Sequence, residues 1–140
     1  MHEAMARSVS ARAETGPELE DCIRLADRAA RACMACADAF LAAADVAPLN
    51  RCLRLSLECA DRCFEVAALS PRRSDTDRFV LDRLLATCAE ASERCVIECR
   101  RHWSGLDACR LCAEACEDAA AACRVARAAV AVPSAQSVNF

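Results

Sequence analysis

Small and apolar side chains recur at helical spacing along four stretches of the chain, with charged residues between them. Side chains three, four, seven or eleven residues apart return to nearly the same face of an α-helix. The stretches are separated at Ala47-Pro48, Ser70-Pro71 and Ser104-Gly105, where helices commonly end. The pattern predicts four helices, over residues 17–44, 49–69, 76–102 and 106–130.

The links between these helices are short, so that consecutive helices should pack antiparallel to each other. We therefore expect an all-α fold, an up-down-up-down four-helix bundle with a cysteine-lined core. Ser74 or Asp75 is the expected N-cap of the third helix. The bundle should span residues 16–131, with flexible segments at 1–15 and 132–140.

Each predicted helix carries one stripe of cysteines, because every gap between neighbouring cysteines within a helix is 3, 4, 7 or 11 residues. At ~100° per residue such gaps keep the side chains within ~60° of one another. The second and third helices share one spacing, offset by 36 residues. The stripes therefore predict sulfur atoms along the buried seam of the bundle. The candidate metal ligands are Cys22, Cys33, Cys36, Cys52, Cys59, Cys63, Cys88, Cys95, Cys99, Cys109, Cys112, Cys116 and Cys123.

The antiparallel arrangement also predicts a level for each sulfur along the bundle axis, at ~1.5 Å of rise per residue. Three cysteines fall together at one end, which we call the mouth: Cys52, Cys99 and Cys109. Cys33 should share a lower level with Cys63 and Cys88. The deepest pair is Cys22 and Cys123.

Composition and charge exclude several classes of function. The net charge is −3 and the sequence shows no basic patch, which argues against nucleic acid as a partner. No apolar run approaches the length of a membrane span. The N-terminal residues show no apolar export signal, so the expected compartment is the cytoplasm. In that reducing environment, thirteen cysteines indicate metal binding or redox chemistry more than disulfides.

Thiolates are soft ligands, which favour Cu(I), zinc or iron–sulfur clusters. The cysteine run of bacterial ferredoxins is absent. A zinc ion bound by four thiolates would leave two excess negative charges in a dry core. Cu(I) accepts two or three thiolates, and one ion per thiolate leaves the core near neutral. Pairs four residues apart, such as Cys59 and Cys63, would form a ladder of two-thiolate sites.

Two alternatives remain open beside a store of many Cu(I) ions. One is a buffer for zinc or another soft metal, and the other is a bundle whose thiols cycle between reduced and disulfide forms. The chain shows no pairing of a nucleophile with a base and no readable substrate pocket, so we do not expect an enzyme.

The cysteine stripes, the sequence CRLCAEAC at residues 109–116 and the preceding His102 resemble the four-helix-bundle copper storage proteins of bacteria. The resemblance implies that thiolates hold many Cu(I) ions inside each bundle, that protomers associate as homotetramers, and that forms lacking an export signal are cytosolic. A copper chaperone or an efflux protein is a further candidate partner. His102 belongs at the mouth, where it either binds incoming metal or caps the end of its helix.

Overall fold

A computed structural model describes residues 16–43, 47–69, 77–102 and 105–137, with the backbone alone at 48 and 131–137. The elements are all helical in these residues, which confirms the predicted fold class. They are α2 (Pro17–Leu41), the 3₁₀ turn η1 (Ala47–Leu49), α3 (Asn50–Ala67), α4 (Arg78–Arg101) and α5 (Asp107–Ser137).

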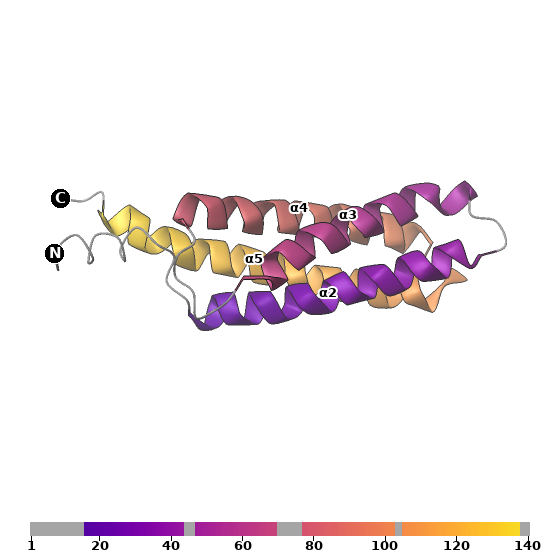
Figure 1. Cartoon of the computed structure of the whole chain (residues 1–140), viewed down its shortest axis with the longest axis horizontal. Coiled ribbons are helices and arrows are strands. Elements are labelled where there is room, and N and C mark those ends of the chain that lie inside the picture. The colour runs from indigo at the N-terminus through magenta and orange to yellow at the C-terminus, as the bar shows by residue number, and fades with distance from the viewer. Residues whose placement is uncertain (1–15, 44–46, 70–76, 103–104, 138–140) are drawn as a thin grey trace.

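The four long helices form an elongated bundle in which the chain direction alternates from each helix to the next (Figure 1). The extensive contacts join α2 to α3, α3 to α4, α4 to α5 and α5 to α2, so the helices surround one axis. The mouth lies where α2 and α4 end and where α3 and α5 begin. In the described part of the chain, no helix is both long and apolar enough to cross a membrane.

Most helix boundaries lie one to three residues from their predictions, and local hydrogen bonds account for two of these differences. α2 ends at Leu41, because the hydrogen bond of Ala43 to the carbonyl of Phe40 tightens the last turn. The N-cap of α4 is Asp77, whose carboxylate accepts a hydrogen bond from the Phe79 N–H at 2.8 Å. Ser74 and Asp75 lie outside the described residues.

The expected end of the last helix at residue 130 was wrong. α5 continues through Pro133 to Ser137 and extends past the other helices (Figure 1). Proline removes one backbone donor, whereas alanine, abundant in the turns before Pro133, is the residue that most favours a helix. The division into a bundle over 16–131 and two flexible flanks stays a prediction.

The core changes character along the axis of the bundle. We call the end opposite the mouth the far end. There the core is aliphatic, with Leu19, Val66, Leu81 and Leu85 buried together. Between this layer and the mouth, the buried residues are mainly cysteines and alanines. Ordinary hydrophobic packing therefore stabilises the far end of the fold. The remaining length is filled mainly by sulfur and small side chains, with the buried Phe40 near the mouth.

Candidate metal centre

All thirteen cysteines lie inside the bundle, each with none of its surface exposed, and all are free thiols. Every stripe faces the axis because its spacing follows the helical period, as the sequence predicts. We call the thirteen Sγ atoms the sulfur column.

Neighbouring sulfurs in the column are in contact over most of its length. From the far end toward the mouth, the close Sγ–Sγ distances are Cys88–Cys63 3.6 Å, Cys63–Cys59 3.8 Å, Cys59–Cys116 3.7 Å, Cys116–Cys33 3.5 Å, Cys33–Cys112 3.6 Å, Cys112–Cys95 3.8 Å, Cys95–Cys99 3.8 Å and Cys99–Cys52 3.7 Å. Each sulfur in the interior of this run therefore lies close to two others.

The contacts between helices are as close as those within a helix. The predicted pair Cys59–Cys63 is present at 3.8 Å, but Cys33 and Cys116, on α2 and α5, approach to 3.5 Å. The sequence predicted the ladder along each helix and one shared seam of sulfurs, but it did not predict which sulfurs of different helices come into contact.

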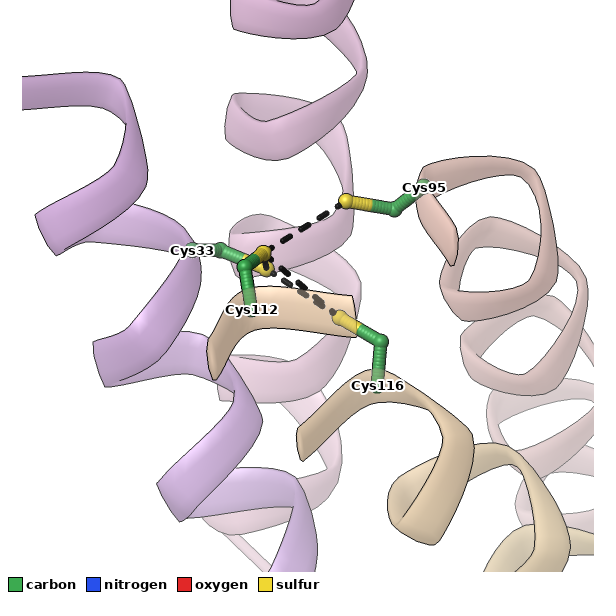
Figure 2. A group of neighbouring side chains, drawn as sticks. All are labelled: Cys33, Cys95, Cys112 and Cys116. Atoms are coloured by element: carbon green, nitrogen blue, oxygen red, sulfur yellow. Dashed lines mark hydrogen bonds between the residues drawn. The ribbon is translucent and has the colours of Figure 1, made fainter. Parts of the chain in front are cut away.

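Eight cysteines gather into three groups whose sulfurs lie within 4.8 Å of one another. The groups are Cys33, Cys95, Cys112 and Cys116; Cys36, Cys99 and Cys112; and Cys52, Cys99 and Cys109. Figure 2 shows the four-sulfur group, in which side chains from α2, α4 and α5 point toward one another. Because Cys99 and Cys112 each belong to two groups, the three form one continuous cluster that ends at the mouth.

Most of the predicted levels are confirmed. The mouth cysteines form one group, Cys63 contacts Cys88, and Cys22 lies 3.4 Å from Cys123 at the far end of the column. Cys33 is the exception, because it joins Cys112 and Cys116 instead of Cys63 and Cys88. One helical turn is only ~5.4 Å, so a small axial shift of α2 changes the level.

Hydrogen bonds among the thiols distribute their protons unevenly. Burial, with a smaller contribution from the charge of Cys36, raises the pKa of the Cys109 thiol to about 12. Hydrogen bonds with Cys112 and Cys36 raise the pKa of Cys99 well above its usual range. Hydrogen bonding to Cys123 and Cys63 lowers the pKa of Cys88 to about 5, against the opposing effect of burial. Metal binding must displace the protons from the thiols whose pKa is raised, such as Cys109 and Cys99.

At the mouth the structure holds a buried carboxylate that the sequence analysis missed. The side chain of Glu98 is 7 % exposed and binds Arg51 of α3 at 3.3 Å and Arg101 at 3.0 Å. His102 is the C-cap of α4, and its Nε2 lies 3.8 Å from the nearer oxygen of Glu98. The sequence carried a signal for this pair, because residues four apart lie on the same face of a helix and Glu98 precedes His102 by four.

His102 is at the mouth end, as predicted, but apart from the sulfurs. Within the described residues, the groups of close ligand atoms contain cysteines only. Its side chain is 25 % exposed, so solvent reaches the imidazole.

The fold and the column define a class of protein: a helical bundle that offers buried soft ligands to many metal ions. The profile of the copper storage protein family matches residues 15–128, and the chain belongs to this family. The donor set fits copper, because every ligand in the three groups is a thiol.

Two of the solved structures similar to this chain are of a protein from Streptomyces lividans. A cytosolic copper storage protein with five coppers is 40 % identical, with a TM-score of 0.76 over 79 % of this chain and 92 % of that one. A form of the S. lividans protein loaded with 10 copper equivalents gives the same identity and TM-score, over 79 % and 84 %. The cysteine-rich protein YhjQ of Bacillus subtilis is 35 % identical over 96 residues, 69 % of this chain and 83 % of its own length.

The raised thiol pKa values predict that the metal-free bundle loses stability in alkali. In Cys109 the folded-state pKa of about 12 lies above the ordinary value of 9.0, so folding favours the protonated thiol. That contribution is complete below pH ~9 and is lost as the pH rises toward ~12, at up to ~1.4 kcal/mol per pH unit for each such thiol. Urea unfolding followed by circular dichroism at a series of pH values measures this loss.

The copper-loaded protein is the control for this experiment, because its bound thiolates have already lost their protons. It should keep its unfolding midpoint over the same range. Equal stability of the metal-free protein at pH 9 and pH 12 would contradict the assignment.

Proposed function

We propose that this chain stores copper as Cu(I), held by the thiolates of the sulfur column. The observation that carries the proposal is the run of buried free thiols, with successive sulfurs 3.5–3.8 Å apart from Cys88 to Cys52. All thirteen cysteines are the proposed ligands. Storage is a binding role, and membership of the copper storage protein family suggests a non-enzymatic one.

The charge balance of the core supports a monovalent ion. Thirteen thiolates without cations would be prohibitively costly to bury, and divalent ions held by four thiolates each would still leave two negative charges per site. One Cu(I) per thiolate leaves no net charge, and sulfurs that bridge two ions allow such a ratio. The contacts between helices supply these bridges.

Zinc is the alternative that a specific observation favours. Cys33, Cys95, Cys112 and Cys116 place four sulfurs within 4.8 Å of one another, as a tetrahedral zinc site requires. The remaining two groups share Cys112 or Cys99 and have three sulfurs each, which suits Cu(I) better.

His102 is proposed to receive copper at the mouth before it passes to the group of Cys52, Cys99 and Cys109. Its partial exposure and its place at the end of α4 support this role. The substitution His102→Ala should slow copper loading, measured by stopped-flow absorbance, because the mouth loses the imidazole that is proposed to receive the ion. An unchanged loading rate would leave His102 as a helix cap.

Anaerobic titration of the metal-free protein with Cu(I) tests the function itself. Thiolate-to-copper absorption should grow until many equivalents per chain have been added, on the order of one copper per thiol, because the whole column is available. Parallel titration with zinc should saturate at far fewer ions.

Saturation by only about three Cu(I) ions would instead indicate four-thiolate sites of the zinc kind. Rapid loss of free thiols under a mild oxidant, with helicity retained, would favour the redox alternative.

The shared cysteines predict an uneven response to substitution. Cys112→Ser should lower the copper plateau by roughly twice as much as Cys22→Ser, because Cys112 belongs to two ligand groups and Cys22 to none of the three. Both serine variants remove one buried thiol and add none, so each is the matched control of the other. Atomic absorption of the desalted, saturated proteins measures the difference, and equal losses would contradict the shared cluster.

A cytoplasmic location is proposed from the sequence, and a cytosolic relative supports it. The homotetramer and exchange with a copper chaperone or efflux protein stay predictions from the resemblance. Apolar side chains on the outer faces, among them Phe64 and Ile97, offer surface for subunit contacts.

A further inference from the structure

Two serines complete the cysteine stripes of the middle helices. Ser56 lies between Cys52 and Cys59 on α3, and Ser92 lies between Cys88 and Cys95 on α4. In both helices the stripe then has residues at steps of four, three and four. The serines are separated by the same 36 residues as the two stripes, so each occupies a position where a thiol would also face the axis.

Both hydroxyls are fully buried and are directed at sulfur. Ser92 Oγ lies 3.6 Å from Cys59 Sγ and 3.7 Å from Cys63 Sγ, and Ser56 Oγ lies 3.8 Å from Cys95 Sγ. Among the described residues, every hydrogen-bond partner of these two hydroxyls is a cysteine sulfur.

This is unusual for a hydroxyl within a helix, which ordinarily bonds a backbone carbonyl in the preceding turn or faces solvent. Thr87, on the same helix as Ser92, shows the ordinary arrangement: its hydroxyl donates to the carbonyl of Leu84 at 3.1 Å. The two serines therefore contribute their hydrogen bonds to the column and not to the helix.

A hydroxyl and a thiol of similar size differ in what they offer to Cu(I). The hydroxyl oxygen is a hard, neutral atom and a poor ligand for a soft ion. Its O–H, however, donates a strong hydrogen bond to a thiolate, whereas a neutral thiol sulfur is only a weak acceptor. The hydroxyls thus gain their strong partners when metal binding converts the neighbouring thiols to thiolates.

We propose that Ser56 and Ser92 are positioning residues for copper: each donates a hydrogen bond to metal-bound thiolates and withholds a further ligand from the column. Ser92 holds the Cys59–Cys63 pair in this way, and Ser56 holds Cys95. In the triangle of Cys59, Cys63 and Ser92, a third sulfur would complete a three-sulfur group, so the hydroxyl keeps this pair a two-thiolate site. The inference rests on the proposed function.

Removing a hydroxyl tests the donor role. In copper-loaded Ser92→Ala, a Cu(I)-specific chelator such as bathocuproine disulfonate should extract the most weakly held copper at a roughly tenfold lower concentration than from the wild type, because a charge-assisted hydrogen bond is lost. The melting temperature of the metal-free variant should not fall, since only a weak acceptor loses its donor. A purely structural serine would give the opposite result, a lower melting temperature and unchanged retention.

Thr87→Val is the matched control. It removes a hydroxyl of the same helix, but this hydroxyl bonds a backbone carbonyl and not a sulfur. It should retain copper like the wild type. If Ser92→Ala and Ser56→Ala both hold copper as tightly as Thr87→Val, the donor role is overturned.

Adding a sulfur tests the withheld ligand. Ser92→Cys should raise the Cu(I) plateau by about one ion, since the new thiol completes a three-sulfur group with Cys59 and Cys63. Thr87→Cys adds a thiol off the seam and should leave the plateau where it is. If folded Ser92→Cys binds no more Cu(I) than Thr87→Cys, the claim that the serine withholds a ligand is overturned. If Ser92→Cys does not fold, Ser56→Cys is measured instead.

The wild type separates failure of this inference from failure of copper storage. A wild-type chain that binds only a few ions refutes the function. A wild type that fills its column, with variants that behave as their Thr87 controls, refutes only the role of the serines.

Discussion

The contact of thiols across the axis of four helices is the constraint on which the structure depends. Packed helices lie with their axes about 8–10 Å apart, so the side chains that four helices turn toward one axis meet there. In this bundle thirteen of those side chains are cysteines, buried without any exposed surface. Leu81 and Leu85 lie in an ordinary aliphatic core at the far end, and the buried Phe40 lies near the mouth end of α2. Folding and metal binding are therefore assigned to different lengths of the same bundle.

Charge explains how one core can exist in two states. Protonated thiols are small, nearly apolar groups, so the metal-free bundle can bury them without counter-ions. The proposed monovalent metal would replace the protons with little change in net charge, so the column would stay neutral. The raised pKa of Cys109 reflects this preference of the core for uncharged sulfur. Among the described residues, Glu98 is the buried charged side chain, and it lies at the mouth, paired with Arg51 and Arg101.

Much of this could be predicted because a stripe of cysteines obeys the helical period, which needs no tertiary information. The spacing of Cys95 and Cys99 fixes their common face in any helix. The predictions failed where local preferences compete. Alanine outweighs Pro133 and carries α5 to Ser137, a balance that pattern rules resolve the other way. Ser56 and Ser92 were not predicted, because the stripes were defined by cysteine alone, although the spacing of both serines continues them.

The sequence by itself determined that four helices form, that each turns its sulfur toward one seam, and that the ligands suit a soft ion. These properties follow from spacing and side-chain chemistry within single helices. Only the tertiary structure decided which sulfurs meet: that Cys33 joins Cys112 and Cys116, that Cys99 and Cys112 are shared, and that serine hydroxyls contact sulfur. Such meetings depend on the axial shift and rotation of one helix against another. The packing of all four helices sets these, and a change of one turn, ~5.4 Å, pairs different atoms.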